Sequence, residues 1–382
     1  MDINKQTQQA GEGSQQIQAT NVTIINNNGP TEEQVNERVK KVVSELIPVA
    51  IKECTEEARE TANERIAKLE NCILPRISQV DGMIESFSDP AFQRLLVKAE
   101  QEAAASEREA DYDLLTELLV YHVQKGDNRK NRAGVLKATE IVDLIDNTAL
   151  CALTIMNTVE TIGPRFGDVM QGMYVLSEIY SKLEYADLPE GIDWMEHLDI
   201  LGAIRLTSNI KLKKFEEYYT RVLDGYACVG IRKESEEYKS AVELLKLIKI
   251  GEYGLRNNIF LDGYVRLDLV NKAHIDDLLI SNSEGVHKIK TEEKNVFNQI
   301  WNMYEKNEEL QKEVDKKFMD MWDSFESLKK VHDFWNSIPT SYDITQVGRI
   351  LAHTNAKRCD PCCCSRRRPY PRRPRKGGSK GL

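Results

Sequence analysis

The sequence predicts a mainly α-helical protein: a multi-helix body with a short N-terminal β segment and long coiled-coil-like helices. Apolar residues recur at spacings of three and four through most of the chain, which is the period of a helix. Glycine (21) and proline (11) are scarce among 382 residues, and four of the prolines fall in the last 22. An all-β protein needs turn residues far more often, so the composition favours helices.

The first predicted element is a polar leader with a short β segment, residues 1–30, which is rich in Gln and Asn. Within it Ile17 and Ala19 alternate with polar residues, and so do Val22 and Ile24, which is the period of a strand. A strand this short is marginal in water on its own. We therefore expect it to pair between copies of the chain and to give a homo-oligomer; an unpaired polar leader is the alternative.

Residues 31–80 predict a kinked coiled-coil-like helix with Thr31 as its N-cap. Apolar residues then follow at alternating spacings of four and three, as in a coiled-coil seam. These residues are Val35, Val39, Val42, Leu46 and Val49. Pro48 predicts a kink, and Pro75 with Asp81-Gly82 predicts the end of the element. Two interpretations remain open: a coiled coil between copies, or a helix packed on its own body.

Residues 89–290 predict a helical globular body. Asp89 is the expected N-cap of its first helix. The apolar pattern predicts further helices over residues 112–123, 135–156, 169–183, 194–206 and 237–250. Val265, Leu267 and Leu269 alternate with polar residues, which indicates a small β element.

Residues 291–356 predict a long C-terminal helix and a closing element. Apolar and aromatic residues at helical spacing predict one helix over residues 292–336, which Pro339 ends. Trp301 and Trp322 widen its apolar stripe, and we expect this stripe to be buried core. The closing element spans residues 344–355.

Residues 357–382 form a Cys/Arg/Pro-rich tail that we predict to be disordered. It contains ten basic residues and one acidic residue, a net charge of +9, so the rest of the chain has a net charge of −18 against −9 for the whole. Its arginines suit nucleic acid or an anionic membrane, and its clustered cysteines suit acylation or zinc. Adjacent cysteines strain a tetrahedral site, which weighs against zinc. A tail without a function is the remaining alternative.

Composition also predicts the compartment. No apolar run reaches the roughly 20 residues that span a bilayer, and the N-terminus is polar, unlike a signal peptide. Four cysteines lie far apart in apolar helical contexts, as is typical of reduced core residues. These are Cys54, Cys72, Cys151 and Cys228. We therefore expect a cytoplasmic protein.

No catalytic, cofactor-binding or metal-binding residue is predicted. The glycines lack the spacing of a phosphate-binding loop, and the six histidines form no His-x-x-x-His pair. Acidic pairs such as Asp143/Asp146 and Asp276/Asp277 are expected on a solvated face. Cys151 or Cys228 would act as a nucleophile only beside a histidine and a third group. We therefore expect no cofactor.

Five short segments together resemble a known family. They are residues 14–24, 89–93, 115–119, 197–200 and 347–355. The family is an uncharacterised bacterial one with a short Gly/Asn-rich β leader, a large helical body and a Val-Gly…Ala-x-x-Asn close. The resemblance covers roughly residues 10–358, and the tail departs from it. It implies no activity and no catalytic residues; its members resemble accessory or phage-defence genes.

The sequence therefore leads to three hypotheses. The first is a non-enzymatic, self-assembling helical scaffold or sensor in bacterial anti-phage defence, with the leader and the seam as its self-association residues. The second is an enzyme or toxic effector with a site built from dispersed residues. The third is binding of nucleic acid or membrane through the tail.

Overall fold

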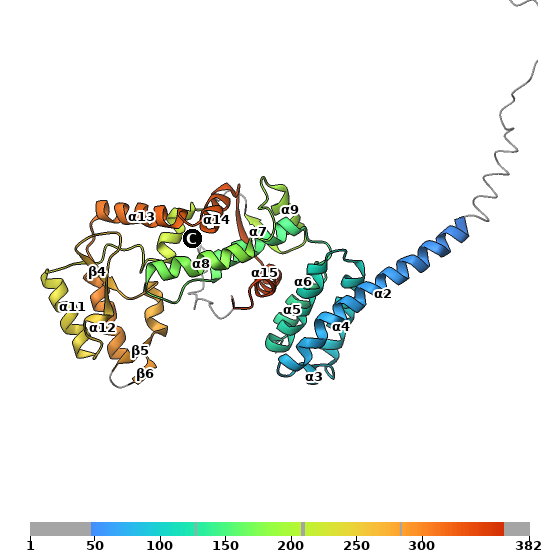
Figure 1. Ribbon diagram of the computed structural model, residues 1–382, viewed down its shortest axis with the longest axis horizontal. Helices are drawn as coiled ribbons and strands as arrows, with labels where there is room; N and C mark the ends of the chain where they lie inside the picture. The colour runs from blue at the N-terminus through green and yellow to red at the C-terminus, as the bar shows by residue number, and fades with distance from the viewer. Residues whose placement is uncertain (1–46, 127, 208–210, 283–284, 363–382) are drawn as a thin grey trace, which may run out of the picture. The chain divides into compact units, whose positions relative to one another are not determined.

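The computed structural model describes residues 47–126, 128–207, 211–282 and 285–362, and these form a mainly α-helical fold (Figure 1). The predicted fold class is confirmed. The chain divides into two compact units, residues 1–60 and residues 61–382. The predicted self-association residues lie outside the described residues. They are Ile17, Ala19, Val22, Ile24, Val35, Val39, Val42 and Leu46.

The helix α2 (Ile47–Gln79) continues through Pro75, so the predicted end at this proline is wrong. Proline removes one backbone donor from a helix interior. Packing offsets that loss, because Leu69 and Ile73 are buried just before it. The chain turns only at Gly82, whose φ of 79° lies in the left-handed region that glycine tolerates.

Six helices follow α2 before residue 184. They are α3 (Met83–Ser86), α4 (Pro90–Ala105), α5 (Glu109–Lys125), α6 (Arg129–Thr139), α7 (Asn147–Thr161) and α8 (Val169–Leu183). The predicted cap is confirmed: the Asp89 carboxylate accepts from the amide of Ala91 at 2.9 Å. The single helix predicted over 135–156 is wrong, because Asp146 instead caps a new helix, α7, by accepting from the amides of Thr148 and Ala149.

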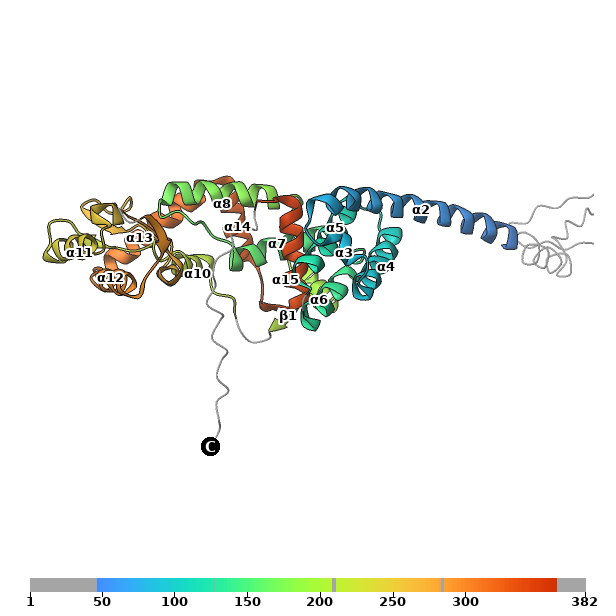
Figure 2. The ribbon, with the colours of Figure 1, turned by 90° about the horizontal axis from the view of Figure 1, so that it is seen from below.

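The closing element is the helix α15 (Gln346–Cys359), which contacts α5, α6, α7 and α8 (Figure 2). The hydroxyl of its N-cap, Thr345, accepts from the amide of Gly348 at 3.1 Å. A Cβ on Gly348 would lie 2.0 Å from the carbonyl oxygen of Ala203, so only glycine permits this approach. The buried Asn355 donates to the hydroxyls of Thr154 (2.8 Å) and Tyr185 (3.0 Å).

Residues 291–337 form three helices, not the single long helix predicted. They are α12 (Thr291–Asn302), α13 (Glu308–Asp323) and α14 (Glu326–Ser337). Asn307 caps α13 by accepting from the amides of Glu309 and Leu310, which starts a new helix there. The turn after α13 brings Leu328 back beside Trp322, whose indole N–H donates to the Leu328 carbonyl at 2.7 Å. Trp322 is fully buried, as predicted, whereas Trp301 is only partly buried.

Short strands and helices occupy residues 193–288, and a final strand precedes α15. The elements are α9 (Asp193–Ile200), β1 (Ile204–Thr207), α10 (Phe215–Val222), β2 (Ile231–Arg232), α11 (Glu236–Leu247), η2 (Gly251–Gly254), β3 (Leu255–Asn257), β4 (Tyr264–Leu267), η3 (Lys272–Asp277), β5 (Leu279–Asn282), β6 (Gly285–Lys288) and β7 (Ser341–Ile344). β4 confirms the predicted β element. The helix predicted over 194–206 is α9 followed by a strand, because β1 pairs antiparallel with β7.

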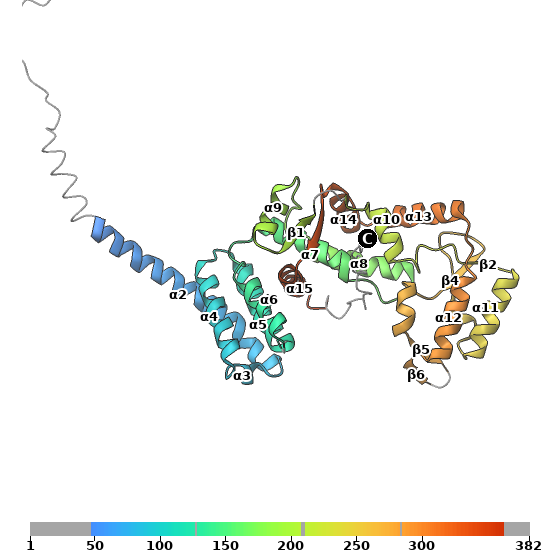
Figure 3. The same ribbon diagram turned by 180° about the vertical axis from the view of Figure 1, so that it is seen from behind.

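Two hydrophobic cores lie within residues 61–362. The first is built mainly by the helices α4 to α9, α13, α14 and α15. The second is smaller and lies among α11, α12 and the antiparallel sheet β2-β4-β3 (Figure 3). Among the described residues, no helix combines the length and the apolar character needed to cross a membrane.

A buried carboxylate connects three helices of the larger core. The side chain of Glu117, on α5, is only 2% exposed. Its Oε1 accepts from Arg76 of α2, and its Oε2 lies 2.8 Å from the Lys357 Nζ of α15. Removing one member of a buried ion group leaves the remaining charges without compensation.

We expect Glu117→Gln to lower the free energy of unfolding by about 3 kcal/mol, since it leaves two cations beside a neutral amide. Urea denaturation measures this loss. Glu313→Gln is the matched control, because Glu313 pairs with Lys317 at 2.6 Å while both side chains are 47% exposed. The control should lose less than about 0.5 kcal/mol. Equal losses in the two variants would contradict a stabilising role for the buried group.

Candidate functional site

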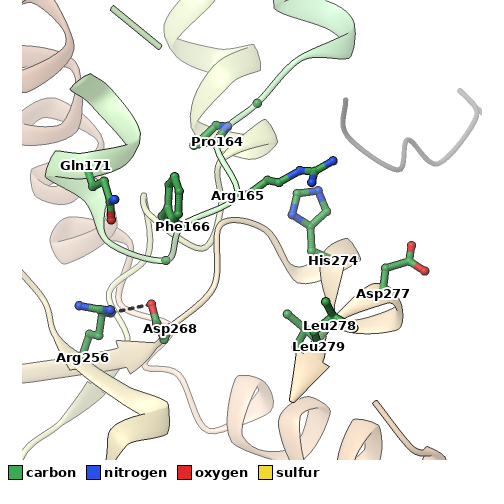
Figure 4. Close-up of a pocket in the computed structure, with 12 residues that line it drawn as sticks. Pro164, Arg165, Phe166, Gln171, Arg256, Asp268, His274, Asp277, Leu278 and Leu279 are labelled. Carbon is green, nitrogen blue, oxygen red and sulfur yellow. Dashed lines mark hydrogen bonds and ion pairs between the residues drawn. The ribbon is translucent and has the colours of Figure 1, made fainter. Parts of the chain in front are cut away.

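A pocket of about 870 Å³ lies where the loop between α7 and α8 meets the smaller core (Figure 4). The loop, residues 163–167, supplies one wall. Arg256 and Asp268, at the sheet, and residues 274–279 supply the others. We call this cavity the junction pocket, because its walls belong to both cores.

Two hydrogen bonds and one close approach of the backbone fix the loop at the pocket. The hydroxyl of Tyr226 donates to the Phe166 carbonyl, and the Arg266 Nη2 donates to the Gly167 carbonyl at 2.6 Å. A Cβ on Gly167 would lie 1.7 Å from the Asp268 Oδ1. This position therefore requires glycine, and the sheet fixes the path of the loop.

Arg266, on β4, is the fully buried cation behind the pocket. Besides Gly167, its guanidinium donates to the carbonyls of Gly225 (3.1 Å) and Leu269 (3.3 Å). Its positive carbon lies 5.5 Å from the centroid of the Tyr226 ring. Burying a charge is costly unless it is well hydrogen-bonded, so these carbonyls and the ring compensate the guanidinium without a carboxylate.

The carboxylates of the pocket already have cationic partners. The Arg256 Nε lies 2.6 Å from the Asp268 Oδ1, and this hydrogen bond raises the pKa of the Arg256 guanidinium above its ordinary value. The Asp277 Oδ1 lies 3.1 Å from the Lys288 Nζ. Neither carboxylate is therefore an uncompensated negative charge.

Arg165 differs, since no hydrogen bond or ion pair to its guanidinium is found within the described part of the chain. Figure 4 shows this guanidinium beside the ring of His274. The neighbouring Phe166 is 45% exposed and also lines the pocket. A guanidinium of this kind can bind an anion. The exposed ring of Phe166 can contact a planar or apolar group attached to that anion.

Cys151 and Cys228, which would need a neighbouring histidine to act as nucleophiles, are poorly placed for that chemistry. Burial raises the pKa of the Cys151 thiol to about 11 and that of Cys228 to about 12. Cys151 donates to the Leu183 carbonyl at 3.2 Å and Cys228 to the Gly225 carbonyl at 3.4 Å. The reactive thiolate is therefore disfavoured at both positions.

Several histidines have polar partners. The His332 Nδ1 lies 2.8 Å from the Asp323 Oδ1, and its Nε2 lies 3.5 Å from the Glu216 Oε2. His287 lies 2.8 Å from Glu293. Among the residues that the structure describes, no group of three or more His, Cys, Asp or Glu side chains is arranged to hold a metal ion.

The acidic pairs singled out in the sequence also have local roles. Asp146 caps α7, as described above. Asp276 pairs with Lys294 and Asp277 with Lys288, and all four side chains are substantially exposed. Asp276 and Asp277 therefore lie on a solvated face, as predicted, whereas Asp143 is partly buried and its Oδ1 is inaccessible, so the prediction is wrong for that residue.

The residues of the junction pocket were not predicted from the sequence. Arg165 and His274 are far apart in the chain, and only the tertiary fold brings them together. One local signal was available: Gly163-Pro164-Arg165-Phe166-Gly167 interrupts two strongly apolar helices, and loops held by a rigid scaffold often contain binding residues.

One protein-family model, with the description “:-like”, matches residues 29–361. The chain belongs to this family. The match includes every residue of the junction pocket, and the description states no activity. Neither a search of curated proteins nor a search of solved structures gave a match.

We expect Arg266→Lys to lower the free energy of unfolding by at least about 2 kcal/mol, because one ammonium cannot satisfy the buried carbonyls that the guanidinium joins. The loop should also loosen, so trypsin should cleave after Arg165 faster than in the wild type. Urea denaturation and limited proteolysis measure the two effects. Arg232→Lys, at an exposed arginine of β2, is the matched control. If both variants behave like the wild type, Arg266 does not hold the loop.

Proposed function

We propose that the protein is a non-enzymatic sensor that binds a small anionic ligand in the junction pocket. The observation that supports this most directly is the unpaired guanidinium of Arg165 beside His274. Both groups face a cavity whose other charges are already paired. A phosphate or carboxylate would complete the hydrogen bonds of this arginine.

The position of the pocket supports a sensing role. A ligand there would contact the loop 163–167, which joins two helices of the larger core, and η3, whose Ile275 lies in the smaller core. A ligand shifts a conformational equilibrium only through contacts that differ between the two states. A site that touches two cores satisfies this condition, because relative movement of the cores changes the site.

The same geometry is less suited to the alternative of an enzyme. A general base must accept a proton from a bound substrate. The pocket carboxylates Asp268 and Asp277 instead face Arg256 and Lys288. Neither carboxylate is therefore placed as a general base, which leaves His274 as the titratable lining side chain that the enzyme alternative would have to use.

We expect adenosine monophosphate to bind the full-length protein more tightly than inorganic phosphate does, because the adenine base can stack on the exposed ring of Phe166. Arg165→Ala should weaken both anions by about tenfold or more, since a hydrogen bond to a charged group contributes about 1.5 kcal/mol or more. Phe166→Ala should weaken only the nucleotide. Isothermal titration calorimetry measures all three proteins.

Arg94→Ala is the control, because Arg94 is an exposed arginine of α4, away from the pocket. It should bind both anions as the wild type does. Equal weakening by Arg94→Ala and Arg165→Ala would indicate non-specific attraction and reject the site. Failure of the wild type to bind either probe would reject this ligand class.

Self-assembly is a second proposed property, and its support is the apolar seam predicted from the sequence. Residues 55–61 of α2 are all exposed, and all of them except Ala58 are polar, as on a solvated helix face. We propose that the leader and the predicted seam pair copies of the chain into a homo-oligomer, in the cytoplasm of a bacterium and in anti-phage defence. Binding of nucleic acid or membrane through the tail remains the third hypothesis.

We expect the full chain to be a discrete oligomer in solution and a variant lacking residues 1–30 to have a lower mass, because the predicted strand is lost. Multi-angle light scattering measures both masses. If both proteins are monomers, the leader does not assemble the chain. If both are the same oligomer, assembly uses another surface.

A further inference from the structure

A second cavity, of about 920 Å³, lies between residues 184–191 and the C-terminal half of α14. We call it the acidic groove. Its charged lining residues are Glu184, Asp187, Glu190, Asp333 and Lys330. The helices α8 and α14 both end at this groove, at Leu183 and Ser337. Helix C-termini have partial negative charge, so the two helix ends and the carboxylates of Glu184, Asp187 and Glu190 favour a cation here. Asp333 is already paired with Lys329 at 2.7 Å.

Glu184 has an unsatisfied oxygen in this groove. Its side chain is 11% exposed, and its Oε2 lies 3.7 Å from the Lys330 Nζ. Its Oε1 is buried and accepts no hydrogen bond from any residue that the structure describes. Burial raises the pKa of this carboxyl to about 7, against the opposing effect of Lys330. A buried acceptor without a donor is costly, so a cationic donor placed there would stabilise the ionised form.

The groove also has an apolar wall, formed by Tyr185, Leu188, Pro189 and Phe334. This wall is firmly supported, because Phe334 packs against the Trp194 ring with centroids 5.7 Å apart. The Trp194 indole donates to the Gly191 carbonyl at 3.0 Å, which holds the end of the loop. Aromatic and proline side chains beside carboxylates suit an extended segment that combines arginine with proline.

The end of α15 leads the chain to this groove. The Arg358 guanidinium lies 5.1 Å from the centroid of the Tyr185 ring, and the Asp360 Oδ1 lies 3.4 Å from the Lys182 Nζ. Tyr185 itself lines the groove. Four residues after Cys362 begins the segment Arg366–Arg375, which has six arginines, three prolines and one tyrosine in its ten residues. Four extended residues span at most about 14 Å, so the segment begins close to the end of α15.

We propose that the acidic groove binds the segment Arg366–Arg375 of this same chain, with a guanidinium on Glu184 and the prolines and tyrosine on the apolar wall. Arginine suits this role because its planar fork can donate two parallel hydrogen bonds to one carboxylate. The proposal is independent of the junction pocket, since the two sites have no residue in common.

The experiment uses a full-length tail-neutral variant in which all six arginines of this segment are changed to serine. A fluorescent peptide with the sequence of residues 365–376 is titrated into it, and anisotropy reports binding. We expect the peptide to bind the tail-neutral variant and to bind the wild type at least tenfold more weakly. The reason is that a segment joined by a short linker competes at a millimolar effective concentration. Binding should also weaken as salt is raised.

Two groove variants, made in the tail-neutral background, locate the site. Glu184→Gln should lower the affinity for the peptide at least tenfold. The double variant Asp187→Asn/Glu190→Gln should lower it to the same extent, and it changes no buried residue. Glu252→Gln/Asp262→Asn is the charge-matched control, because both of these acids are exposed and lie outside the groove. It should bind like its parent.

Four results would overturn the proposal: no binding to the tail-neutral variant, no loss in the groove variants, equal loss in the control, or equal peptide affinity of the wild type and the tail-neutral variant. Light scattering on the wild type and the tail-neutral variant distinguishes a second copy as the occupant. A higher mass for the wild type alone would mean that the segment binds between chains, which contradicts binding within one chain.

Discussion

The arrangement of the larger core depends on the burial of α15. Leu351, Ala352 and Asn355 are completely inaccessible on this helix. A buried amide must be hydrogen-bonded, and the bonds from Asn355 to Thr154 and Tyr185 can form only at one rotation and one height of the helix. That placement brings Lys357 to Glu117, so the polar contacts fix a position that hydrophobic packing alone would leave less specific.

The smaller core is joined to the larger one by the hydrogen bonds of a buried arginine. Arg266 is buried with backbone carbonyls as its hydrogen-bond acceptors, and these carbonyls come from the loop before α8 as well as from the smaller core. Its guanidinium therefore holds the loop without neutralising any carboxylate. The carboxylates of the junction pocket pair with Arg256 and Lys288, and Arg165 has no ion pair with any of the described residues.

The limits of sequence interpretation follow from the range of each interaction. The cap at Asp89 and the alternation around Val265 are local, and the sequence alone was sufficient to predict them. Asp146 and Asn307 are also local caps, but the apolar period continues past both, and the period alone predicted unbroken helices. The spacing of apolar residues predicts which face of a helix is buried. It does not predict where the helix ends and the chain reverses direction.

Neither site could be predicted, because each depends on which charges remain unpaired after folding. The net charge of −9 favours cationic partners for the chain as a whole, but it does not predict which charges line either cavity. In the junction pocket the carboxylates are paired and a guanidinium is left over, whereas in the acidic groove Glu184 has a lysine only at 3.7 Å. Ion pairing is decided by distances of a few ångströms between residues that are far apart in sequence. The charge of the ligand that a cavity favours is therefore decided by the side chains left unpaired in that cavity, and the net charge of the chain does not predict it.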